Sequence, residues 1–129
     1  MAITTNAISV TGPFGSHLGT LPTPWQINAT SADATGCEEI VAAPGAGYQL
    51  CITRLTIGLG AAITVTVGSG VAAGAVEGDP IGPIGGAAGT YMLDFRDAPV
   101  ALTANKSLTV DASGAGDICV YAEGFTRAA

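Results

Sequence analysis

The side chains that carry acid–base or nucleophilic chemistry in enzymes are scarce in this chain. It has one histidine, His17, within the turn-like segment Phe14-Gly15-Ser16-His17-Leu18-Gly19. A catalytic triad needs its imidazole to meet a nucleophile and an acid from other segments. The chain also lacks the Gly-x-Ser-x-Gly pattern of a nucleophile elbow. We therefore expect a solvated His17 and predict that the protein is not an enzyme.

Carboxylates are the next candidates, because paired acids perform general acid–base catalysis and bind metal ions. The pairs available are drawn from Asp94, Asp97, Asp111, Asp117 and Glu123. All five fall in predicted turns or on predicted outward faces, where carboxylates are normally solvated. Asp111 and Asp117 flank a glycine-rich loop, but the loop lacks the dense oxygen ligands of a calcium site. We interpret them as hairpin-capping residues and predict no metal ion and no cofactor.

A glycine-rich motif, Gly68-Ser69-Gly70-Val71-Ala72-Ala73-Gly74, follows a predicted strand. A dinucleotide-binding motif requires a helix next, so that the helix N-terminus faces the pyrophosphate. The residues that follow include Gly78, Pro80, Gly82 and Pro83, and these cannot continue a helix. The motif therefore predicts a flexible loop.

The three cysteines, Cys37, Cys51 and Cys119, are widely spaced and form no Cys-x-x-Cys motif. Neither a zinc site nor a redox motif is indicated by this spacing. We interpret the cysteines as buried, reduced thiols that act as small apolar side chains. A disulfide between Cys51 and Cys119, on neighbouring strands, is the alternative.

The charge balance excludes two classes of partner. Four basic against ten acidic residues leave a net charge of −6, whereas nucleic acids and anionic membranes are bound through lysine and arginine. The uncharged stretch Leu55–Val76 is long enough to span a membrane. Its segment Ile63–Val67 alternates with a period of two and is β-branched, which indicates a strand instead. We predict no nucleic-acid and no membrane partner.

Glycine and proline interrupt the whole chain, and no segment shows the apolar stripe of an amphipathic helix. Short alternating runs separated by turn residues are typical of an all-β fold. We predict an antiparallel β-sandwich or jelly roll with an extended N-terminal arm. The expected strands are Glu38–Ala42, Tyr48–Leu59, Ala62–Gly68, Asp79–Ile84, Thr90–Phe95, Lys106–Ala112 and Ile118–Phe125.

Alternation also assigns side chains to faces. Leu108 and Val110 are expected to point inward, and Thr109 and Asp111 outward. Within Tyr48–Leu59 the apolar alternation changes phase around Thr53-Arg54. A β-bulge there, or a crossing of the strand between two sheets, would explain the change.

The first third of the chain has a different character. Residues 1–35 contain three prolines and little alternation, and we expect an N-terminal arm or edge strands there, followed by a sandwich domain over residues 36–129. Apolar side chains in this segment need a surface to cover, and we predict contacts with a partner or with a neighbouring subunit through Phe14, Leu18, Leu21 and Trp25. For Trp25, packing onto the protein's own sandwich is an equal alternative.

Several segments together are similar to a known family. They are Pro44–Leu55, Ala62–Gly68, Gly82–Gly85, Thr90–Phe95 and Ile118–Phe125. Taken together, they resemble the small jelly-roll decoration (cement) proteins of tailed bacteriophage heads, over roughly residues 37–127. The resemblance implies a homotrimer that binds the major capsid protein at local three-fold positions and reinforces the shell, with no active site or cofactor. It places the protein on the outer capsid surface of a virion assembled in the host cytoplasm.

A carbohydrate- or receptor-binding β module of a phage head fibre or tail is the alternative function. Such sites usually offer exposed aromatic rings with polar neighbours. The candidates are Trp25, Tyr48, Tyr91 and Tyr121, which fall in different segments. The acidic charge suits an exterior position in either case, since it does not compete for packaged DNA.

Overall fold

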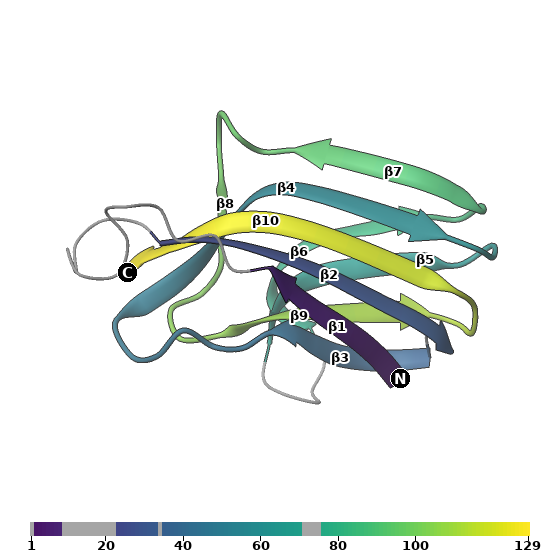
Figure 1. The fold of residues 1–129 in the computed structure, drawn as a ribbon, viewed down its shortest axis with the longest axis horizontal. Helices are drawn as coiled ribbons and strands as arrows, with labels where there is room; N and C mark the ends of the chain where they lie inside the picture. Colours follow the sequence, from purple (N-terminus) through teal and green to yellow (C-terminus); the bar gives the residue numbers. More distant parts are fainter. Residues whose placement is uncertain (1, 9–22, 34, 71–75) are drawn as a thin grey trace.

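The computed structural model describes residues 2–8, 23–33, 35–70 and 76–129. In these residues the chain forms ten strands and no helix, and the strands make two antiparallel sheets that face each other (Figure 1). The predicted all-β sandwich is confirmed. No helix in the described part of the chain is long and apolar enough to cross a membrane.

The larger of the two is named sheet A and the smaller is named sheet B. Sheet A has the order β1 (Ala2–Ile8), β2 (Thr23–Asp33), β10 (Ile118–Ala128), β4 (Tyr48–Leu59) and β7 (Gly89–Asp94), with β8 (Val100–Ala101) also paired to β4. Sheet B has the order β3 (Thr35–Val41), β9 (Ser107–Ser113), β5 (Thr64–Gly70) and β6 (Val76–Gly85). The described residues of the uncharged stretch Leu55–Val76 thus lie in β4, in β5, in the turn between them and at the start of β6, and none of them is in a helix.

The core lies between the sheets and is built by period-two alternation. Its side chains are branched aliphatics from both sheets, and most are completely buried: Ile52, Leu55, Ile57, Val65, Val67, Leu108, Val110 and Val120 have no exposed surface. Removal of this apolar area from water is the main force that holds the sheets together.

One side chain that was predicted to point outward, that of Thr109, is not exposed to solvent. Thr109 lies on the outer face of sheet B, opposite Gly68 of β5, yet it has no exposed surface. The side chain of Val76 lies against Gly68, where an added Cβ would come within 2.6 Å of Val76 Cγ1. The Thr109 hydroxyl is hydrogen-bonded to Ser107 Oγ at 2.9 Å, so its burial leaves no unpaired oxygen.

The change of phase predicted within Tyr48–Leu59 (β4) is caused by a β-bulge, which was one of the two predicted alternatives. Between β10 and β4, Glu123 is opposite Arg54, but Gly124 is opposite Ile52, so Thr53 is the extra residue. The Thr53 hydroxyl donates to the carbonyl of Glu123 at 3.1 Å, and its own carbonyl accepts from Phe95 N at 2.7 Å. These bonds satisfy the backbone groups that the bulge takes out of the ladder.

The N-terminal third contributes two strands to sheet A. β1 is an edge strand, and β2 pairs with β1 on one side and with β10 on the other, from Thr23 to Ser31 (Figure 1). Residues 23–33 are therefore part of the sandwich. The predicted contact residues Phe14, Leu18 and Leu21 lie outside the described residues.

The predicted alternative of a Cys51–Cys119 disulfide is wrong. Cys51 is opposite Phe125 on β10, six residues along that strand from Cys119. At about 3.4 Å per residue the two cysteines are roughly 20 Å apart, far beyond the reach of a disulfide. All three thiols are free, but only Cys51 is buried, whereas Cys37 is half-buried and Cys119 is exposed.

Candidate binding face

The outer face of sheet A carries the densest group of functional side chains in the described residues. Strand register arranges them in rows across the sheet, because directly opposite residues share a face. One row is Gln26, Glu123, Arg54 and Asp94, contributed by β2, β10, β4 and β7 in turn. The next row is Asn28, Tyr121, Thr56 and Met92 from the same four strands.

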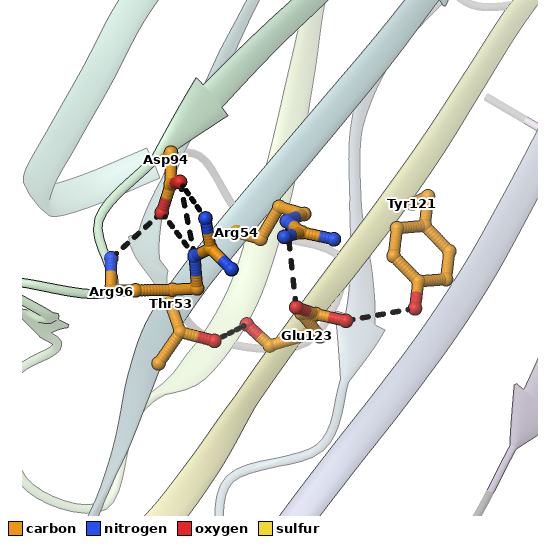
Figure 2. Close-up of polar contacts among 6 residues, drawn as sticks. All are labelled: Thr53, Arg54, Asp94, Arg96, Tyr121 and Glu123. Atoms are coloured by element: carbon orange, nitrogen blue, oxygen red, sulfur yellow. Dashed lines mark hydrogen bonds and ion pairs between the residues drawn. The ribbon is translucent and has the colours of Figure 1, made fainter.

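Two ion pairs occupy the first row (Figure 2). Arg54 Nε lies 3.6 Å from Glu123 Oε1, across the β10–β4 ladder. Asp94 is held by Arg96, whose Nε donates at 2.9 and 3.0 Å to its two oxygens and whose Nη2 donates at 2.6 Å to Oδ2. Each carboxylate is thus matched by one guanidinium, and the group as a whole carries no net charge.

Hydrogen bonding sets the ionisation of two groups in this cluster. The hydrogen bonds from Arg96 lower the pKa of the Asp94 carboxyl to about 2 from an ordinary value of 3.8. The Tyr121 hydroxyl donates to Glu123 Oε2 at 3.0 Å. Desolvation, followed by this hydrogen bond and the negative charge of Glu123, raises the pKa of Tyr121 above 10.0.

A hollow of about 480 Å³ opens on this face between β10, β4 and β7. Its walls are Arg54, Thr56, Met92, Leu93, Asp94 and Tyr121. The volume falls within the roughly 300–1,000 Å³ that small-molecule sites occupy. Met92 is 79% exposed, which makes it the most exposed large apolar side chain in the described residues.

A second hollow, of about 180 Å³, lies at one end of sheet B and is lined by Ser69, Glu77, Gly78, Thr103 and Lys106. Lys106 Nζ is 4.0 Å from Glu77 Oε2, so its charge is already balanced. The space is smaller than typical ligand sites. We assign no binding to it.

The edges of the two sheets differ in their protection against strand addition. In sheet B, edge strand β3 carries Glu38 and Glu39, and edge strand β6 carries Pro80 and Pro83, the charges and prolines that normally block pairing with another chain. In sheet A, the edge strand β1 (AITTNAI) has neither, and β7 (GTYMLD) has one charge at its last residue. No described residue pairs with the outer edge of β1 or β7.

The remaining predicted candidates are placed as follows. Trp25 is half-buried on β2 and packs against the core of its own sandwich, where an added Cβ on Gly124 would lie 2.9 Å from Trp25 Cζ2. Tyr91 is also partly buried against the core, and Tyr48 is 43% exposed at the far end of β4. His17 lies outside the described residues.

Two of the five candidate carboxylates come together on this face. Asp94 and Glu123 both join the cluster around Arg54, but each is neutralised by an arginine. Among the described residues no three histidine, cysteine, aspartate or glutamate side chains gather closely enough to hold a metal ion.

Sequence reasoning missed Arg54, Thr56 and Met92 as members of one site. The available signal was that alternation along β4 and β7 turns these residues outward. Alternation does not show which strands pair, and the pairing of β4 with β10 and β7 joins segments far apart in the chain.

No protein-family model, no curated protein and no solved structure matches the chain.

Proposed function

We propose that the protein is a phage capsid decoration protein, a homotrimer that binds the major capsid protein on the outer surface of the head and stabilises the shell. The proposal rests on the resemblance of the strand and turn segments over residues 37–127. The observation that carries it furthest is the pair of unprotected edges on sheet A.

The strand order supports the jelly-roll part of the proposal. With β1 and β8 set aside, eight strands form two four-stranded sheets, in the orders β2-β10-β4-β7 and β3-β9-β5-β6. Along the chain each strand enters the sheet opposite its predecessor, except at the β5–β6 pair, which lies within sheet B. Two Greek keys wound into two sheets in this way are the jelly-roll arrangement, which recurs in viral capsid proteins.

The edges of sheet A support self-association. A strand edge without charge or proline is a template for pairing with another chain, so it is normally covered. Four successive antiparallel pairings separate β1 from β7, so these two edges run in the same direction. Pairing β7 of one copy with β1 of the next is therefore a head-to-tail contact, and such contacts close into a ring under three-fold symmetry.

The charge and the N-terminal segment support the docking part of the proposal. A net charge of −6 suits a position outside a shell that encloses DNA. Phe14, Leu18 and Leu21, which lie outside the described residues, remain the proposed contacts to the shell or to a neighbouring subunit. Trp25 is accounted for by its own sandwich and is dropped from that set.

Two measurements on the full chain test the proposal. Sedimentation equilibrium at micromolar concentration should give the mass of a trimer. The trimer should also co-sediment with capsids assembled from the major capsid protein encoded in the same genome, up to about one trimer per local three-fold position. A monomer would contradict the edge argument. A trimer that stays in the supernatant would contradict the capsid-binding function.

A further inference from the structure

We propose that the hollow on the outer face of sheet A binds an uncharged saccharide. This is a binding activity in addition to shell reinforcement, and it does not depend on capsid binding. The hollow lies on the outer face of sheet A and extends to its edge strand β7. Strand pairing uses the backbone groups in the plane of the sheet, so pairing at β7 leaves the side chains of this face accessible.

The charged side chains around the hollow are paired with one another. The charged groups that line the hollow or pair with its walls are Arg54, Glu123, Asp94 and Arg96, and they form two complete ion pairs. A phosphate or carboxylate ligand would find no unpaired cation here, and a metal ion would find no unpaired carboxylate. The ligand that fits this field is electrically neutral.

The polar groups of the walls provide the second step. Arg54 uses Nε for Glu123, which leaves its other guanidinium N–H groups without a partner in the described residues. The Thr56 hydroxyl can both donate and accept, and the Asp94 oxygens retain further lone pairs. Donors and acceptors thus alternate around one small space, which matches the hydroxyl groups of a sugar.

The apolar surface provides the third step. Tyr121 presents its ring to the hollow, while its hydroxyl is fixed by Glu123 at 3.0 Å. Met92 contributes an exposed thioether side chain at the opposite wall. A pyranose ring has one face of C–H groups that packs on such surfaces, whereas a purely apolar ligand would desolvate Arg54 and Asp94 without compensation.

Preorganisation is the fourth step. Thr56 is directly opposite both Tyr121 and Met92, and Arg54 is directly opposite both Glu123 and Asp94. The walls stand on paired strands, not on loops, and binding therefore costs little ordering of the chain.

The test uses the full-length protein and neutral methyl glycosides of glucose, galactose, mannose, rhamnose and N-acetylglucosamine as probes. Amide ¹H–¹⁵N spectra are recorded at millimolar glycoside, because a shallow site of this size gives weak binding to one sugar. We expect saturable shifts confined to residues 54–56, 92–94 and 121–123 for at least one glycoside. Inorganic phosphate and N-acetylneuraminic acid at the same concentrations should leave these amides unmoved.

Three variants make the test specific. Tyr121→Ala removes the ring, Thr56→Val removes one hydroxyl at nearly constant volume, and Arg54→Lys keeps the charge but loses the planar donor fork. Each should weaken glycoside binding at least tenfold. The matched control is Tyr48→Ala, an exposed tyrosine outside the hollow, which should bind as the native protein does.

Defined outcomes overturn the proposal. They are the absence of saturable shifts with all five glycosides, equal loss of binding in Tyr48→Ala, or a stronger response to phosphate or N-acetylneuraminic acid. Thr56→Val is nearly isosteric, so native-like binding in a folded Thr56→Val protein also counts against it. Trimer mass and capsid co-sedimentation do not depend on the glycosides, so a failure here is distinguishable from a failure of the decoration function.

Discussion

Arg54 shows how single residues acquire a role on this sheet. Its side chain is 40% exposed and lies between carboxylates on two neighbouring strands, Glu123 on β10 and Asp94 on β7. Opposite-charge pairs placed directly across strands contribute about 0.2–1 kcal/mol each. The arrangement therefore adds little stability, and its main effect is to hold a neutral polar surface in a fixed geometry.

The ionisation of Asp94 is a prediction at this scale. Its pKa is lowered to about 2 by hydrogen bonds from Arg96, against 3.8 when it is unperturbed. A depressed carboxyl pKa stabilises the folded state above about pH 4, and that contribution is lost as the pH falls from about 4 to 2. Carboxyl chemical shifts in an NMR titration should show an Asp94 midpoint near pH 2.

Arg96→Ala is the variant that checks the cause. It removes the side-chain hydrogen bonds that lower this pKa most, so the Asp94 midpoint should move up toward 3.8. A midpoint near 3.8 in the native protein would mean that the Arg96 contact does not persist in solution.

Thiol reactivity is the second prediction at the residue scale. Cys51 has no exposed surface, and burial raises the pKa of its thiol; burial also raises the pKa of the half-buried Cys37. Since the thiolate is the reactive form, both should react slowly with a disulfide reagent. The exposed Cys119 should react first, and Cys119→Ser should abolish that fast phase.

Unfolding provides the control for that measurement. In guanidinium all three thiols should react without prior reduction, because none is in a disulfide. If two of the thiols reacted only after a reductant was added, the result would contradict the strand register that separates Cys51 from Cys119.

At the scale of the element, the bulge in β4 governs how sheet A is built. Thr53 is the extra residue, and it lets Leu50 and Ile52 on one side and Leu55 on the other all reach the core. Gly124 lies on β10 directly beside this irregularity. A Cβ added there would overlap the carbonyl oxygen of Cys51, which is backbone and cannot move aside.

Gly124→Ala should therefore destabilise the protein strongly. We expect a loss of at least about 2 kcal/mol in the free energy of unfolding, the range in which overpacking of a rigid site falls. The matched control is Gly58→Ala on β4, where an added Cβ would meet Cys119 Cβ at an ordinary 3.7 Å. That change should cost less than about 1 kcal/mol. Urea unfolding measures both, and equal losses would refute the role given to the bulge.

At the scale of the whole molecule, the two sheets have opposite tendencies toward other chains. Sheet B has protected edges, whereas sheet A has two unprotected edges that run in the same direction. Together with a charged content of 11%, this favours a ring of subunits joined through sheet A.

Lysine placed on these edges tests that arrangement. Thr4 on β1 is opposite Thr30 and Thr90 on β7 is opposite Gly58, so Thr4→Lys and Thr90→Lys each add a charge to an edge strand of sheet A. Each should weaken trimer association at least tenfold, which is about 1.4 kcal/mol. Sedimentation velocity across a dilution series measures the shift.

Thr35→Lys is the matched control, because it adds the same charge on the protected edge strand β3. It should leave the trimer intact, with circular dichroism confirming that all three variants remain folded. A trimer disrupted only by Thr35→Lys would place the subunit contact on sheet B.

The sequence by itself determined the local structure of most of the sandwich. The strand Tyr48–Leu59 was predicted with its observed ends, and its phase change around Thr53-Arg54 predicted a bulge or a strand crossing, of which the bulge is observed. Alternation also placed Tyr121, Glu123 and Asp94 outward and Leu108 and Val110 inward, as observed. These features are local because side-chain direction in a strand is set by residues two apart.

Only the tertiary structure decided what depends on contacts between distant segments. Strand order and register brought Arg54 between Glu123 and Asp94, and nothing in the local pattern of any one strand encodes that neighbourhood. Thr109 is buried opposite Gly68 of β5, against which Val76 of β6 lies, and these neighbours come from other strands. Thr23–Asp33, which shows little alternation, became an inner strand because β1 and β10 supply partners on both sides, and partners far away in the chain override weak local preference.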